Sequence, residues 1–353
     1  MNAPVSLPSA ERAVRADGAV DASVLGRYLA PLRPFLDDEL LTEIVVNRPG
    51  EVFVEGPAGW MRHAVPALSF GTLNFLSVAA AAFTRQDIGP DHPIISTTLP
   101  GGERCQIVTP PAVPPGTVSL TIRKSAKLAM TLDGFERRDL FRDVRVSTEE
   151  LSVEEEQLLR LRNEGRWRAF LEQAVLARRN IIISGATGSG KTTLSKGLVA
   201  CIPPHERILT IEDTAELTIP HKNHVRLLYS KDGQGVARIG PRELLESSLR
   251  MRPDRILLQE LRDGTAFYYL RNVNSGHPGS ITTVHADSAK LAFEQLTLLV
   301  KESAEGRELS REDIRSLLTL SVDIVVQMAR RDGQYRITEV YYDPHAKRRA
   351  AGA

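Results

Sequence analysis

Eight residues, from Gly185 to Thr192, have the types and the spacing needed to hold a chain of phosphates. They read Gly-Ala-Thr-Gly-Ser-Gly-Lys-Thr and match the pattern GxxxxGK[ST] in full. An Ile-rich apolar stretch precedes them and a helix-like run, 191–201, follows, which is the context that this motif requires. Small residues let successive backbone N–H groups and a helix N-terminus surround phosphate oxygens. The residues expected to bind the nucleotide, ATP, are Gly185, Ala186, Thr187, Gly188, Ser189, Gly190, Lys191, Thr192 and Thr193.

The last two residues of the motif have separate expected tasks. Lys191 should reach the β- and γ-phosphates, and the hydroxyl of Thr192 should ligate Mg²⁺. Hydrolysis also needs a carboxylate that orients water or organises the metal ion, and Glu212 and Glu260 each end a strand-like segment. Carboxylates at the carboxyl ends of parallel strands lie beside the phosphate-binding crevice. The sequence leaves open which of the two glutamates orients water and which serves Mg²⁺.

Histidine and arginine supply the remaining candidates. His285 ends the strand-like stretch 280–286, where it could hydrogen-bond a catalytic carboxylate or sense the nucleotide state. His277 lies in the loop before that stretch, and its role is left open. Arg104 and Arg123 lie beside strand-like segments of the first third of the chain. Either could bring positive charge to a γ-phosphate, although exposed arginines on strands usually serve solubility.

The composition excludes several classes of protein. The chain has 353 residues, of which 42% are hydrophobic and 25% charged, and its net charge is +1, as expected for a globular protein without a basic excess that would argue for nucleic-acid binding. Two cysteines cannot form a four-Cys zinc site. Apolar runs stay well below a membrane span, and the first residues lack the features of a signal peptide. We therefore expect a cytoplasmic protein whose membrane contact is peripheral, with direct nucleic-acid binding left open.

The pattern of strands and helices predicts two folded domains. Residues 1–20, rich in Ala, Pro and charge, are expected to be disordered, and residues 21–126 to form a small α+β domain. That domain has strand-like segments at 42–47, 51–56, 105–111 and 117–124 and a helix-like one at 71–85. Residues 127–163 are highly charged and are expected to form a linker, in which Ser152 and Glu155 fit a capping box.

The remaining chain alternates between short apolar strands and helices. The strand-like segments lie at 179–184, 206–213, 254–261 and 280–286, and helix-like segments separate them. Such alternation predicts a parallel sheet buried on both faces, within an α/β domain of residues 164–346. Asp332-Gly333 predicts a hairpin between 322–328 and 335–342. The tail, 347–353, is basic and is expected to be frayed.

Four segments in a fixed order resemble a known family. They are GATGSGKTT, LTIEDTAEL, RILLQELRDGTA and SGHPGSITTVHA. This order resembles the Walker A, Asp box, Walker B and His box of the type II/type IV secretion ATPases, with similarity over roughly residues 29–344 that includes EIVVNRPGEVFVE and LPGGERCQIV. The match is best to the cytoplasmic traffic ATPases of type IV secretion and conjugation. The chain lacks the four-Cys zinc module frequent in type II and pilus-assembly relatives, which favours the type IV branch.

The resemblance implies a fold, a site and partners. It implies a RecA-like P-loop NTPase domain preceded by a smaller α+β N-terminal domain, and a homo-hexameric ring with Mg·ATP between the two domains. By the same resemblance Glu212 and Glu260 are catalytic carboxylates, His285 and His277 belong to the His box, and Arg104 and Arg123 contact nucleotide phosphate. The partners would be inner-membrane components of a type IV secretion system, with peripheral association at that membrane. Gln259 departs from the small residue that the family often has before Glu260.

Three alternatives remain open from the sequence. A pilus assembly or retraction motor, or a type II secretion ATPase, would share the chemistry and differ in the machinery it drives. A small-molecule P-loop kinase would transfer the phosphoryl group to an acceptor, and a nucleotide-gated scaffold would bind ATP without turning it over.

Overall fold

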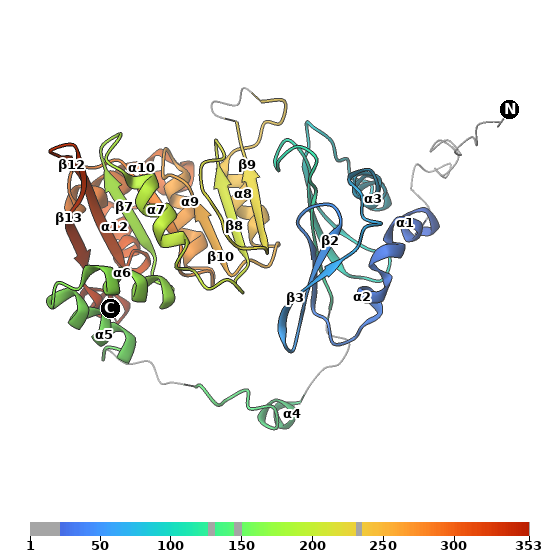
Figure 1. Cartoon of the computed structure of the whole chain (residues 1–353), viewed down its shortest axis with the longest axis horizontal. Coiled ribbons are helices and arrows are strands. Elements are labelled where there is room, and N and C mark those ends of the chain that lie inside the picture. Colours follow the sequence, from blue (N-terminus) through green and yellow to red (C-terminus); the bar gives the residue numbers. More distant parts are fainter. Residues whose placement is uncertain (1–21, 126–130, 145–149, 231–234, 353) are drawn as a thin grey trace. The chain divides into compact units, whose positions relative to one another are not determined.

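The computed structural model describes residues 22–125, 131–144, 150–230 and 235–352, so the expected disorder of residues 1–20 lies outside it. The chain divides into two compact units by its internal contacts. The first comprises Met1–Lys127, Ser230–Ile239 and Arg250–Arg252, and the second Leu128–Tyr229, Gly240–Leu249 and Pro253–Ala353. Both combine helices with sheets (Figure 1), so the predicted α/β class is confirmed.

The first unit is built on a six-stranded antiparallel sheet in the order β3-β2-β1-β6-β5-β4. The strands are β1 (Glu43–Val46), β2 (Glu51–Gly56), β3 (Gly59–Ala64), β4 (Ile94–Thr98), β5 (Arg104–Val108) and β6 (Ser119–Arg123). The predicted strand-like segments 42–47 and 51–56 contain β1 and β2, which pair as an antiparallel hairpin across Arg48-Pro49-Gly50. The two edge strands, β3 and β4, were not predicted from the sequence.

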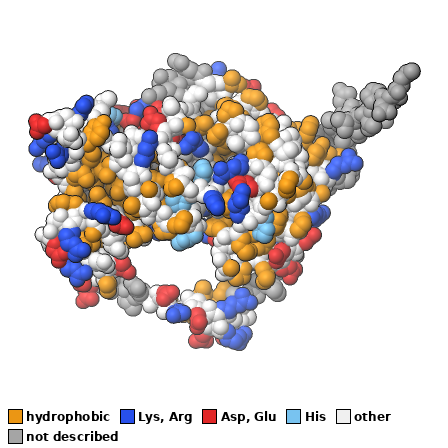
Figure 2. Space-filling view, viewed as in Figure 1, with side chains coloured by type: hydrophobic (Ala, Val, Ile, Leu, Met, Phe, Trp, Pro, Cys, Tyr) orange, Lys and Arg blue, Asp and Glu red, His pale blue; other side chains and the backbone are white. Residues whose placement is uncertain are grey.

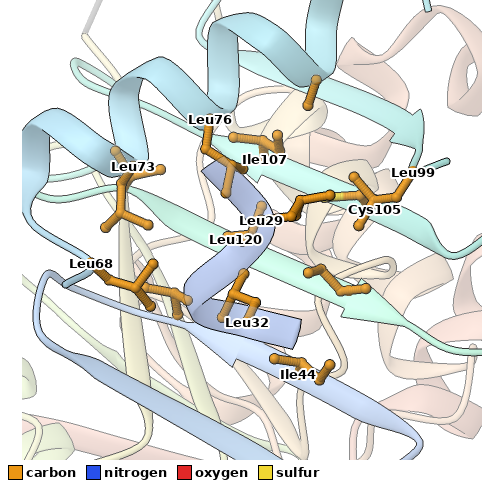
Figure 3. Packing of buried hydrophobic residues seen from close by; sticks show 14 of the residues in the cluster. Leu29, Leu32, Ile44, Leu68, Leu73, Leu76, Leu99, Cys105, Ile107 and Leu120 are labelled. Atoms are coloured by element: carbon orange, nitrogen blue, oxygen red, sulfur yellow. The ribbon is translucent and has the colours of Figure 1, made fainter. Parts of the chain in front are cut away.

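Helices on this sheet bury a leucine-rich core. They are α1 (Ala22–Leu29), η2 (Ala30–Leu32), α2 (Arg33–Asp37) and α3 (Phe70–Phe83). Prolines at the starts of η2 and α2 divide the first helical stretch into short pieces. In Figure 3 Leu29, Leu73 and Leu76 pack over strand residues of the sheet. Cys105 lies in this core, and burial raises the pKa of its thiol far above the ordinary range.

Most parallel strands of the second unit lie in segments that the sequence predicts as strands. These are β7 (Ile181–Gly185), β8 (Ile208–Glu212), β10 (Arg255–Leu258), β11 (Ile281–Val284) and β12 (Ile324–Arg331), which is followed by the antiparallel β13 (Gln334–Tyr342). The parallel edge strand β9 (His224–Leu228) was not predicted from the sequence. The ladders run β10-β8-β9 and β11-β7-β12-β13. A hydrogen bond of 2.8 Å from the Leu261 N–H to the Thr283 carbonyl joins the ends of β10 and β11. β7, the strand that leads into the predicted P-loop, is thus separated from β10 by β11.

Helices cover both faces of this sheet (Figure 1). Because crossovers between parallel strands are right-handed, α7 (Lys191–Val199) lies on one face and the helices after β9 lie on the other. These are α8 (Pro241–Ser248), α9 (Thr265–Val273), α10 (Ala289–Glu302), α11 (Ala304–Arg307) and α12 (Arg311–Ser321). The predicted hairpin is confirmed: Asp332 and Gly333 have φ of 51° and 75°, as its tight turn requires.

The charged stretch after the first unit contains two helices, α4 (Leu132–Glu136) and α5 (Val153–Asn163). The predicted capping box is present, since Ser152 and Glu155 each bond the other's backbone N–H. The sequence predicts a linker over residues 127–163, whereas Leu158 and Leu161 of α5 are buried in the core of the second unit, together with residues of α6 (Trp167–Leu176). Because these two leucines stand three residues apart, they share one face of the helix. That apolar face packs on the core although the surrounding sequence is highly charged.

The prediction of a frayed basic tail is wrong. Residues Pro344–Gly352 form helix α13. Lys347 Nζ lies 2.7 Å from Asp323 Oδ1, and Arg348 Nη2 lies 2.7 Å from Glu155 Oε2. Both carboxylates are buried, so the basic residues of the tail neutralise charge that would otherwise be costly inside the unit.

Charges are mixed over the molecular surface. Figure 2 shows lysine and arginine side chains interspersed with acidic and apolar ones on the visible face of each unit. None of the described helices combines the length and the apolar character needed to cross a bilayer.

A buried ion pair fixes the start of β10 at the edge of the sheet where β8, β10 and β11 begin. Arg255 is fully buried, and its Nε and Nη2 donate to Glu206 Oε2 and Oε1 at 2.7 and 3.0 Å. Its Nη1 donates to the Gly279 carbonyl at 3.3 Å, and Arg178, which is half-buried, lies 3.2 Å from the same glutamate. A bidentate arginine therefore ties the segments before β8, β10 and β11 together.

We expect Arg255→Ala to destabilise the second unit by about 3–5 kcal/mol, because it leaves Glu206 buried with one half-exposed partner. Urea unfolding followed by Trp167 fluorescence measures this unit alone once Trp60 is replaced by Phe, since the chain has 2 tryptophans. Arg242→Ala, which breaks exposed pairs with Glu246 and Glu305, is the control and should move the midpoint far less. Equal midpoints for Arg255→Ala and the parent would contradict the assignment.

Candidate active site

The predicted phosphate-binding loop connects β7 to the first turn of α7. Gly188 and Gly190 adopt φ of 73° and 94°, which other residues rarely accept. Gly185 is packed so closely that a Cβ would lie 2.5 Å from the carbonyl oxygen of Met328. Ala186, Thr187 and Gly188 are exposed. The loop therefore presents its backbone to solvent while its two ends are fixed against the sheet.

Lys191 is held at the base of this loop and is only 9% exposed. Its ammonium donates to the carbonyls of Gly185 and Ala186 at 2.7 and 3.0 Å, and lies 3.4 Å from His285 Nδ1. Burial lowers the pKa of Lys191; Glu260 opposes that effect and Arg262 adds to it. The ammonium thus already lies among acceptors, which phosphate oxygens could replace.

The carboxylate of Glu260 lies between the side chains of His285 and Arg262. His285 Nε2 lies 3.0 Å from Glu260 Oε1, and Arg262 Nη2 lies 2.5 Å from Glu260 Oε2. Arg262 also reaches Asp213 Oδ2 at 3.5 Å, and the hydrogen bond to Glu260 raises the pKa of Arg262. Glu260 follows β10 and His285 follows β11, so the shared carboxyl edge of the sheet brings them to Lys191.

The contacts of Glu212 differ from those of Glu260. It is fully buried at the end of β8, and Oε1 accepts bonds from Thr210 Oγ1 at 2.6 Å and Arg226 Nε at 3.0 Å. Oε2 accepts bonds from the backbone N–H groups of Glu216 and Leu217 at 2.8 and 2.9 Å. Its carboxylate thus anchors the loop after β8, a task that the sequence did not predict.

Arg104 and Arg123 are neighbours in the first unit. They are register partners on β5 and β6, and both are exposed. Glu43 Oε1 lies 3.4 Å from Arg123 Nε. Like charges directly opposite each other on adjacent strands repel. An anion bound between them would relieve that repulsion.

His277 lies apart from the residues around Lys191. It precedes β11, whereas His285 follows it, so the two histidines mark opposite edges of the sheet. A cavity of about 650 Å³ lies at the same edge of the sheet as His277. It is lined by Arg178, Asn180 and Asp323 among others. Arg178 pairs with Glu206 and Asp323 with Lys347, so the charges of this cavity are largely balanced from within.

A magnesium ion would find few ready-made protein ligands. Within the described ranges no group of three or more His, Cys, Asp or Glu residues could hold a metal ion. Thr192 is half-buried in the first turn of α7, and Glu260 Oε1 is a buried oxygen without a hydrogen bond of good geometry. This donor set fits Mg²⁺, which typically binds one or two protein oxygens together with water and substrate phosphates.

Comparison with known proteins identifies the family. The model of the family "Type II/IV secretion system protein" matches residues 27–344. The chain belongs to this family. It is 53% identical over 335 residues to the type IV secretion system protein VirB11 of Bartonella henselae, covering 92% of this chain and 94% of that protein. It is 46% identical over 333 residues to VirB11 of Brucella suis, covering 93% and 92%.

A solved structure extends this similarity to the fold. The crystal structure of the VirB11 ATPase from the Brucella suis type IV secretion system, in complex with sulphate, superimposes with a TM-score of 0.90 at 45% identity, covering 94% of this chain and 98% of that one. The resemblance to the type IV secretion ATPases noted in the sequence is therefore confirmed.

Sequence reasoning missed two residues of this secretion protein's site. Arg262 stands two positions after Glu260, a spacing that places alternate side chains on one face of an extended segment, and this signal was available. Tyr335 was missed because its proximity to the loop depends on the pairing of β12 with β7. A Cβ built on Gly190 would lie 2.9 Å from the ring of Tyr335.

We expect Gly185→Ala to displace the loop, because φ of 155° and the Met328 carbonyl both exclude a Cβ. Affinity for a fluorescent ATP analogue should fall by roughly tenfold or more. Gly197→Ala in α7, where a Cβ would meet nothing within 4 Å, is the matched control and should stabilise the helix by up to about 1 kcal/mol. Unchanged affinity in Gly185→Ala would show that the loop does not bind the nucleotide.

Proposed function

We propose that this chain is the ATPase that powers a type IV secretion system, and that it hydrolyses Mg·ATP at the loop Gly185–Gly190. The observation that carries the proposal is the convergence of Lys191, Glu260 and His285 at one edge of the sheet, in a chain that belongs to the secretion family. In this proposal residues 164–346 are a RecA-like ATPase domain preceded by the α+β domain 21–126. β11, which lies between β7 and β10, supports the RecA-like arrangement.

The chemistry follows from the groups already in place. Water attacks the γ-phosphorus and gives a proton to the carboxylate of Glu260, the bond from that phosphorus to the β–γ bridging oxygen breaks, and ADP leaves with the electron pair. The N–H groups of the loop and the Lys191 ammonium stabilise the negative charge that develops on the phosphate oxygens. Thr192 would hold Mg²⁺, and the chemistry that the ion would supply is further neutralisation of phosphate charge.

Glu260 is the carboxylate that we assign to the water. One of its oxygens faces His285 and the other Arg262, so its orientation is fixed from two sides. Glu212 was expected to share this role or that of metal ligand. Since its two oxygens already accept four hydrogen bonds, we propose that it acts through the loop it anchors.

Arg104 and Arg123 provide positive charge from the N-terminal domain in this proposal. Their mutual repulsion on adjacent strands is consistent with a site for an anion, here the phosphates of ATP. Binding would then draw the two domains together, and hydrolysis and release would allow them to separate.

The working form that we propose is a homo-hexameric ring held peripherally at the inner membrane by components of the secretion system. The relatives are named as type IV secretion system proteins, which supports assembly with the components of such a system, whereas the six-fold ring rests on the family resemblance alone. Electron microscopy of the protein with an ATP analogue should reveal six-fold rings. A persistent monomer at micromolar concentration would contradict the ring.

Three substitutions separate the proposed roles. Glu260→Gln should lower phosphate release by roughly 100-fold or more and retain ATP binding, because it removes a general base. Lys191→Ala should lose both turnover and affinity. Glu212→Gln should mainly lower the unfolding midpoint, and Glu216→Gln, which alters a pair with Gln259, is the control.

Phosphate release without an added acceptor would also exclude a small-molecule kinase. Full activity of Glu260→Gln, or complete inactivity of a stably folded Glu212→Gln, would reverse the assignment of the two glutamates. No turnover by the parent protein would favour a nucleotide-gated scaffold.

The arginine pair has its own test. Arg104→Ala and Arg123→Ala should each lower turnover by roughly tenfold or more, since cations at the γ-phosphate stabilise the transition state. Arg33→Ala, which removes an exposed arginine paired with Asp37 in the same unit, is the matched control. Turnover equal to the parent in both arginine variants would remove the N-terminal domain from the chemistry.

A further inference from the structure

The hairpin β12–β13 lies directly beside the phosphate-binding loop. β12 pairs in parallel with β7, and the register joins Gln327 to Ser184 and Met328 to Gly185. Two register pairs beyond Met328 along the hairpin, Arg330 lies opposite Tyr335. The ladder that carries the loop therefore also fixes the position of Tyr335.

The aromatic ring of Tyr335 rests on the last glycine of the loop. A Cβ built on Gly190 would lie 2.9 Å from both Cγ and Cδ1 of Tyr335, and 3.3 Å from Cδ2. Contacts with three ring atoms place Gly190 beneath the ring. Tyr335 is nevertheless 54% exposed, so much of the aromatic surface remains open to solvent.

The sheet order gives the direction in which a bound nucleotide must run. Glu260 and His285 follow β10 and β11, on one side of β7, whereas β12 and β13 lie on the other side. A triphosphate whose γ end lies at Glu260 has its α-phosphate, ribose and base at the opposite end. That end extends past the start of α7 towards the hairpin.

We propose that Tyr335 forms the stacking surface for the purine base of the nucleotide. This inference rests on the proposed function of the loop and adds the subsite that receives the base. Aromatic rings bind the π-face of any base, so the subsite contributes affinity for the nucleoside part and discriminates weakly between adenine and guanine. The glycine at position 190 is needed because a side chain there would displace the ring.

The test compares two ligands that share the phosphates and differ in the base. Tyr335→Ala should weaken ATP binding by roughly fivefold to 150-fold, the range typical of losing one base–aromatic stack. Affinity for inorganic tripolyphosphate, which has no base, should stay unchanged. Tyr335→Phe should bind ATP as the parent does, and Gln334→Ala, an exposed neighbour on β13, is the control. Titration calorimetry in magnesium buffer measures all four proteins.

Each outcome points to a different conclusion. Equal weakening of ATP and tripolyphosphate in Tyr335→Ala would mean that the ring only supports the loop, and would overturn the inference. Parent-like ATP affinity in Tyr335→Ala would also overturn it and leave the proposed function intact. Failure of the parent protein to bind either ligand would instead contradict the proposed function itself.

Discussion

The buried ammonium of Lys191 is the group on which the site depends. A lysine taken out of water retains its charge only if acceptors surround it, and here two loop carbonyls provide them. Those carbonyls are in position because the glycines of the loop adopt backbone angles that other residues rarely accept. The ammonium therefore links the conformation of the loop to Glu260, whose charge raises the pKa of Lys191 against the effect of burial.

Parallel pairing turns distant parts of the sequence into one site. β7, β10 and β11 all end at the same edge of the sheet, and the loop, Glu260 and His285 each follow one of these strands. The opposite edge is fixed by different means, namely the Arg255–Glu206 pair and the ion pairs of α13. Rigidity at that edge allows the carboxyl edge to present loops to a ligand.

The sequence predicted the central strands of both units and missed three of the edge strands. Buried strands such as β7 are continuous apolar runs, whereas β3, β4 and β9 lie at sheet edges and owe their conformation to a single neighbour. The tail was misjudged because its basic residues pair with Asp323 and Glu155, which are far away in sequence. At the site, the loop motif was sufficient to place Lys191. The hydrogen bonds of Glu212 and the contact of Tyr335 with Gly190 require the folded chain.

A crystal structure with magnesium and a non-hydrolysable ATP analogue tests the central claim most directly. The account predicts that Lys191 Nζ exchanges a loop carbonyl for an oxygen of the β- or γ-phosphate, and that Glu260 is the carboxylate nearest the γ-phosphorus. A triphosphate bound away from Gly185–Gly190, or one whose γ-phosphate faces Glu212 rather than Glu260, would contradict it.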